Sequence, residues 1–160
     1  MRKIFGLLVC LSVLAMGATA LADTSFNEKH NIYLSIVPHC YHIDRPSDGD
    51  TINESPKGIM ISVNNWELLT YENSYYDQTI FMGKAFETKK YKPIENEMFI
   101  RYRIHLGLLY GYGDHFRNVC GLTPAIAPTI EIGYRNISSE LMMIPAIDNT
   151  VMAIAFKIRL

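Results

Sequence analysis

The stretch MFIRYRIHLGLLY, residues 98–110, decides the fold. Every second residue of it has an apolar or aromatic side chain, and these side chains share one side: Met98, Ile100, Tyr102, Ile104, Leu106, Leu108 and Tyr110. The other side carries Arg101, Arg103, His105, Gly107 and, one residue beyond the end of the stretch, Gly111. A period of two is typical of a β-strand. The apolar side is long enough for the ~9–11 residues with which a strand crosses a bilayer, so the stretch predicts an outer-membrane strand with lipid outside and a polar lumen inside.

The C-terminus has the same pattern, because Met152, Ile154, Phe156, Ile158 and Leu160 alternate with Ala153, Ala155, Lys157 and Arg159. A last strand of this kind is typical of outer-membrane proteins, although Leu160 stands where an aromatic residue is usual. The whole chain predicts about eight strands, near 31–43, 57–64, 66–73, 78–88, 97–111, 122–134, 137–145 and 150–160. We therefore predict an all-β protein, an eight-stranded antiparallel transmembrane β-barrel.

Two tight turns, at Asn64-Asn65 and Arg135-Asn136, separate pairs of these strands. Short turns of such barrels lie in the periplasm and longer loops lie outside the cell. The loops at 44–56, 73–77, 111–121 and 146–149 are therefore expected on the extracellular side. The charged strand residues Arg101, Arg103, His105, Glu131, Lys157 and Arg159 are expected to form a salt-bridge network in the lumen, since buried charges must be paired.

Length and charge favour a single domain and argue against a nucleic-acid-binding protein. The chain has 160 residues, of which 49% are hydrophobic and 19% are charged, and its formal net charge is −1. That length fits one domain. The near-zero charge argues against nucleic acid as a partner, which would require a basic surface.

The N-terminal residues 1–22 predict a cleaved signal peptide. Arg2 and Lys3 precede an apolar run from Ile4 to Met16, and Ala20-Leu21-Ala22 is an A-x-A cleavage site. A transmembrane anchor is the alternative, but the run is shorter than the ~20 residues that a spanning helix needs. We expect Sec-type export to the bacterial outer membrane, with residues 23–160 as the barrel domain.

The remaining cysteines, Cys40 and Cys120, can form a disulfide in an oxidising compartment or stay as two free thiols. Neither belongs to a spacing typical of metal ligands. We find no phosphate-binding loop and no H-E-x-x-H or C-x-x-C motif, so no metal or other cofactor is expected.

Several segments resemble one family in their order and spacing. They are His105-Leu106-Gly107-Leu108, Pro124 and Pro128 followed by Gly133-Tyr134, then Met143-Ile144-Pro145, and Asn53-Glu54-Ser55-Pro56 with Gly58. Together they resemble the lipid A palmitoyltransferases, eight-stranded outer-membrane barrels that move a palmitoyl chain from a phospholipid to lipid A. We expect this chain to be a monomer with phospholipid and lipid A as its partners. Proline cannot donate to a β-ladder, so Pro124 and Pro128 imply a gap in strand pairing. In the family such gaps admit lipid laterally.

The resemblance also implies site residues. The family's histidine falls on His39, with His42 as the second choice, and its Asp-Ser pair falls on Asn73 and Ser74. Asn stands here where the family has Asp, so the chain lacks the carboxylate that would stabilise an imidazolium at that position. Asp44 or Asp77 are possible substitutes.

Two functions follow. One is an acyltransferase that moves a palmitoyl-like chain from phospholipid to lipid A, with His39, Asn73 and Ser74 as its site. The other is a non-catalytic barrel of the same fold that binds a lipid or alters the envelope, in which His39 is an ordinary lumen residue and Asn73-Ser74 is turn chemistry. A soluble lipocalin-like binder is a third possibility.

Overall fold

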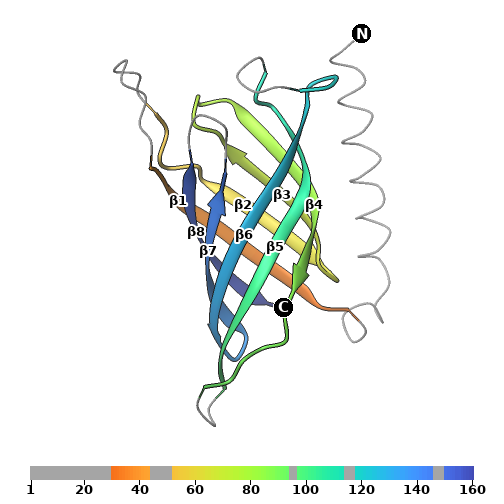
Figure 1. Ribbon diagram of the computed structural model, residues 1–160, viewed down its shortest axis with the longest axis vertical. Coiled ribbons are helices and arrows are strands. Elements are labelled where there is room, and N and C mark those ends of the chain that lie inside the picture. Colours follow the sequence, from red (N-terminus) through yellow and green to blue (C-terminus); the bar gives the residue numbers. More distant parts are fainter. Residues whose placement is uncertain (1–29, 44–51, 94–96, 114–117, 146–149) are drawn as a thin grey trace. The chain divides into compact units, whose positions relative to one another are not determined.

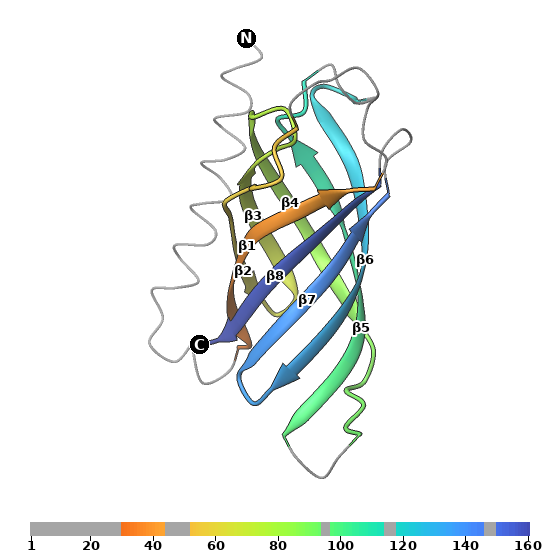
Figure 2. The same ribbon diagram turned by 90° about the vertical axis from the view of Figure 1, so that its left-hand side faces the viewer.

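The computed structural model describes residues 30–43, 52–93, 97–113, 118–145 and 150–160. They contain eight strands, β1 (Ile32–His42), β2 (Gly58–Val63), β3 (Trp66–Glu72), β4 (Gln78–Glu87), β5 (Met98–Tyr110), β6 (Leu122–Tyr134), β7 (Ile137–Ile144) and β8 (Val151–Arg159). Each strand pairs antiparallel with its neighbours in sequence, and β1 pairs with β8. The sheet is thus a closed barrel (Figures 1 and 2).

The predicted eight-stranded antiparallel barrel is confirmed, and each strand lies within a residue or two of its expected place. At the first predicted turn, Asn64 and Asn65 have φ angles of 50° and 68°, a conformation that asparagine tolerates well. The proposed signal peptide, residues 1–22, lies outside the described residues. None of the described residues forms a helix long and apolar enough to cross a membrane.

Alternation along the strands separates two surfaces of the barrel. In β5, Tyr102 and Ile104 are exposed on the outer face while Arg101, Arg103 and His105 are buried in the lumen. The same division holds in β8, where Ile154 and Phe156 face outward and Ala155 is fully buried. The exposed large side chains of the barrel wall are therefore mostly apolar.

One strand breaks the alternation. The register between β1 and β8 shifts between Ile36 and His39, at Pro38, which cannot donate to the ladder. Val37 is buried before the shift, but His39 after it is exposed. Strict alternation had placed His39 on the inward face with Val37, and that placement is wrong because the irregularity reverses the inward and outward positions.

Pro124 and Pro128 lie where β6 pairs with only one neighbour. All of β6 pairs with β5, whereas its pairing with β7 runs only from Thr129 to Tyr134. The loop-side half of β6, residues 122–128, is therefore not paired with β7. The gap expected from the two prolines is present.

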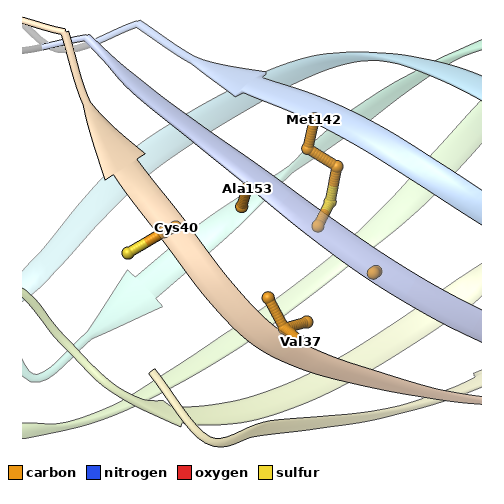
Figure 3. Close-up of a cluster of buried hydrophobic side chains, with 5 residues drawn as sticks. Val37, Cys40, Met142 and Ala153 are labelled. Atoms are coloured by element: carbon orange, nitrogen blue, oxygen red, sulfur yellow. The ribbon is translucent and has the colours of Figure 1, made fainter. Parts of the chain in front are cut away.

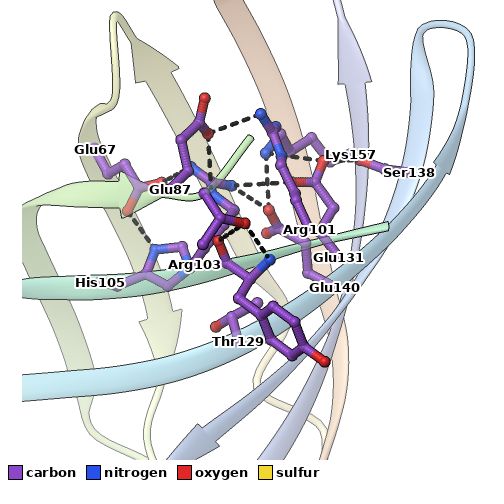
Figure 4. A network of polar contacts seen from close by, with 12 residues as sticks. Glu67, Glu87, Arg101, Arg103, His105, Thr129, Glu131, Ser138, Glu140 and Lys157 are labelled. Atoms are coloured by element: carbon purple, nitrogen blue, oxygen red, sulfur yellow. Dashed lines mark hydrogen bonds and ion pairs between the residues drawn. The ribbon is translucent and has the colours of Figure 1, made fainter. Parts of the chain in front are cut away.

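The half of the lumen nearest the tight turns contains acidic and basic side chains in contact with one another, which we call the charged layer (Figure 4). Its members are Glu67, Glu87, Arg101, Arg103, His105, Glu131, Glu140 and Lys157. Arg103 contacts both Glu67 and Glu140, and the ammonium of Lys157 lies 2.8 Å from Glu140. The expected network is present, except that Arg159 is exposed at the end of β8.

The half of the lumen nearest the loops is apolar. A buried cluster joins Val37 and Cys40 of β1 to Met142 of β7 and Ala153 of β8 (Figure 3). These side chains form part of the wall of a cavity of about 100 Å³. Cys40 is buried and Cys120 is exposed, and both are free thiols. Of the two alternatives for the cysteines, the structure therefore has the free thiols.

The charged layer predicts that removing the charge of a buried carboxylate lowers the free energy of unfolding much more than removing the charge of an exposed one. Glu140→Gln removes the charge that two buried cations share, so the free energy of unfolding should fall by about 3–5 kcal/mol. Glu97→Gln removes the exposed partner of Arg135 and should cost under about 1 kcal/mol. Urea unfolding of the protein in detergent micelles measures both values, and equal losses would contradict this account of the lumen.

Candidate functional site

Three chain segments meet at the loop end of the barrel and hold the candidate site. They are the end of β1 with His42, the segment at Asn53 and Glu54, and the loop after β3 with Ser74. Backbone hydrogen bonds connect them, because Cys40 donates to the Glu54 carbonyl and Asn53 donates to the Ser74 carbonyl, each at 3.0 Å. The positions of the site residues are thus set by main-chain contacts.

Ser74 and His42 are in direct contact. The His42 Nε2 atom lies 2.8 Å from the Ser74 Oγ atom, and the imidazole is fully buried. A hydroxyl hydrogen-bonded to an imidazole is the arrangement by which a histidine takes the proton of a serine nucleophile. The pair can therefore attack an acyl ester, provided that the ester reaches Ser74.

Asn73 has a different part in this arrangement. Its buried side-chain amide donates to Thr79 Oγ1 at 3.0 Å and to the Gly111 carbonyl at 3.3 Å. Its Oδ1 accepts from the backbone N–H groups of Tyr75 and Asp77. All of these contacts shape the loop, so Asn73 serves as a loop-forming residue beside Ser74.

His39 does not lie with the other predicted site residues. It is exposed on the outer face of β1, opposite Ile154 of β8, whereas His42 is the histidine that meets Ser74. Of the two carboxylates considered as substitutes, Asp44 lies outside the described residues and Asp77 is exposed. The structure therefore brings together Ser74 and the second-choice histidine.

Glu54 is the carboxylate that sequence reasoning missed. Its Oε1 atom lies 3.9 Å from His42 Nδ1, on the opposite side of the imidazole from Ser74, and its side chain is 27% exposed. Asn53, next to it, donates from its side chain to the carbonyls of Glu72 and Asn73. The Asn53-Glu54 pair was visible only as a motif of the resemblance, because a residue outside the strands has no alternation to indicate which way it faces.

Ser74 lines the apolar cavity. The walls near it include Val37, Leu69 and the tyrosines Tyr71 and Tyr112, whose hydroxyls lie 3.1 Å apart. Burial raises the pKa of Tyr112 above its ordinary value, so this hydroxyl stays protonated and can donate a hydrogen bond. A serine at the wall of an apolar cavity suits an ester that carries a hydrocarbon chain.

A metal centre is not indicated within the described part of the chain, where no three His, Cys, Asp or Glu side chains gather as ligands.

The contacts of Asn73 predict that restoring the family's aspartate is harmful. In Asn73→Asp, a carboxylate oxygen replaces the amide that donates to the Gly111 carbonyl, so two acceptors face each other. The free energy of unfolding should fall by about 1–3 kcal/mol. Chemical denaturation of the variant beside the wild type measures this change, and an unchanged or greater stability would contradict the loop-forming role.

Comparison with known proteins assigns no family. No protein-family model matches the chain, and no curated protein is similar enough to count as a relative. The resemblance to the lipid A palmitoyltransferases therefore stays an expectation, and the candidate site rests on its own geometry.

Proposed function

We propose that this protein is an outer-membrane acyltransferase that moves an acyl chain from a phospholipid to lipid A. The observation that carries the proposal is the 2.8 Å contact between Ser74 Oγ and His42 Nε2 at the wall of an apolar cavity inside a barrel. A nucleophile and its base in this setting can form and break an acyl ester. The cavity is the place for the hydrocarbon chain.

The outer face of the barrel supports a place in a membrane. Ile59, Ile132, Ile158 and Phe156 are between 43% and 52% exposed, and such residues recur around the wall. An apolar surface of this extent would be unfavourable in water but is suited to lipid. With the predicted signal peptide, it supports the outer membrane as the location and argues against the soluble lipocalin-like alternative.

The unpaired part of β6 supports lateral access for a lipid. Ile126 lies in this part and is 46% exposed, yet it also lines the cavity. A residue that borders both the outside and the cavity supports an extension of the cavity toward the gap beside β7. An acyl chain from the bilayer can therefore enter here without passing through the loops.

The proposed reaction has two steps in which His42 moves the proton. Ser74 Oγ bonds to the acyl carbon, its proton passes to His42, and the ester C–O bond of the phospholipid breaks. His42 returns the proton to the leaving lysophospholipid alkoxide. A hydroxyl of lipid A then gives its proton to His42 and bonds to the acyl carbon, and Ser74 leaves and regains the proton.

Asn73 favours the second candidate, a non-catalytic barrel that binds lipid. Its amide is engaged in loop contacts and has no charge to offer to an imidazolium. On this view the hydrogen bond between Ser74 and His42 only stabilises the loop end. The two candidates differ in what happens to lipid A.

Mass spectrometry of lipid A from cells that express the protein distinguishes them. Wild type should add one acyl chain, whereas Ser74→Ala and His42→Gln should lower the product by about 100-fold or more, because each removes a partner of the proton transfer. His39→Ala should leave the product unchanged, since His39 lies on the outer face.

Heat-modifiable gel mobility serves as the folding control for all three variants. No added acyl chain with a folded, surface-located wild type would refute the acyltransferase. Loss of product in His39→Ala but not in His42→Gln would refute this site.

A further inference from the structure

We infer that Glu54 is the positioning carboxylate of the site and completes a Ser74–His42–Glu54 triad. This inference rests on the proposed Ser74–His42 chemistry but does not depend on lipid A as the acyl acceptor. It assigns to residue 54 the part that an aspartate at position 73 would otherwise take.

The two nitrogens of His42 face different partners. Nε2 contacts Ser74 Oγ at 2.8 Å, and Nδ1 lies 3.9 Å from Glu54 Oε1. The ring therefore lies between a hydroxyl and a carboxylate, in the order found in serine hydrolases and acyltransferases. A distance of 3.9 Å is an ion-pair separation, and catalytic contacts often tighten only when the substrate is bound.

The main chain brings Glu54 to this place. Its carbonyl accepts from the N–H of Cys40, two residues before His42 on β1. The preceding residue, Asn53, donates its N–H to the Ser74 carbonyl. The carboxylate, the imidazole and the hydroxyl thus come from three segments that are hydrogen-bonded to one another beside the triad.

Other carboxylates near the loop end fit the role less well. Glu72 has a cationic neighbour, Lys57, whose ammonium lies 3.7 Å away. Asp77 is exposed, and its N–H is held by Asn73 Oδ1. Glu54 is the carboxylate within ion-pair distance of His42 among the described residues.

The charge of Glu54 has two effects on His42. It favours the tautomer with hydrogen on Nδ1, which leaves Nε2 free to accept the proton of Ser74. It also stabilises the imidazolium that forms when that proton is taken. Because the Glu54 side chain is 27% exposed, solvent screens part of this interaction and the effect should be smaller than in a fully buried triad.

The test uses a long-chain alkyl fluorophosphonate on the full-length protein in micelles, because this probe reports on Ser74 without any acceptor. Ser74 Oγ bonds to phosphorus, its proton passes to His42 and then to solvent, and the P–F bond breaks with loss of fluoride. The rate of labelling is followed by mass spectrometry, with Ser74→Ala as the unlabelled blank.

Glu54→Gln should lower the labelling rate constant by about 10- to 1,000-fold with little change in the probe concentration at half-maximal rate, since charge is lost and not binding. Glu54→Asp should restore part of the rate, and the acid limb of the pH–rate profile of Glu54→Gln should move to lower pH. Asp77→Asn is the matched control and should label at the wild-type rate.

Each outcome decides the question. A wild-type rate in Glu54→Gln, an equal loss in Asp77→Asn, or a wild-type protein that is not labelled at Ser74 would overturn the triad. Labelling that depends on Glu54, in a protein that adds no acyl chain to lipid A, would retain the triad and reject only the proposed acyltransferase. Thermal unfolding of Glu54→Gln close to wild type excludes a general loss of structure.

Discussion

Closure of the sheet, with β1 hydrogen-bonded to β8, is the constraint on which the rest of the structure depends. A closed sheet has no free edge along most of its length, and its inward side chains share one narrow lumen. Arg101, Arg103 and Lys157 can be buried there only because Glu67, Glu131 and Glu140 project from other strands to meet them. The lumen network and the apolar outer face are therefore two results of the same alternation.

The places where this closure is incomplete are the places that the proposed function uses. The loop-side half of β6 has no partner in β7, and the end of β1 pairs with β8 but not with β2. The first gap meets the apolar cavity at Ile126. Beside the second, the segment at Asn53 and Glu54 accepts a hydrogen bond from the Cys40 N–H and contributes to the candidate site. The charged layer fills the other half of the lumen, so a bound chain has room only at the loop end.

The strands could be predicted from the sequence because alternation is a local property of each segment, as in residues 98–110. The site could be predicted only in part. Ser74 was indicated only by the resemblance, and the choice between His39 and His42 depends on the register shift at Pro38, which reverses the two faces of β1. Glu54 and Asn73 lie outside the strands, and their roles depend on contacts with segments distant in sequence. The alternation of side chains along a strand gives no information about such contacts.

A crystal structure of the protein after reaction with a long-chain alkyl fluorophosphonate tests the central claim most directly, namely that Ser74 is the nucleophile and that the lumen cavity holds the acyl chain. We predict phosphorus bonded to Ser74 Oγ, His42 Nε2 within hydrogen-bond distance of the adduct, and the alkyl chain between Val37, Leu69 and Met142. An adduct on another residue, or an alkyl chain outside the barrel with the cavity empty, would contradict the account.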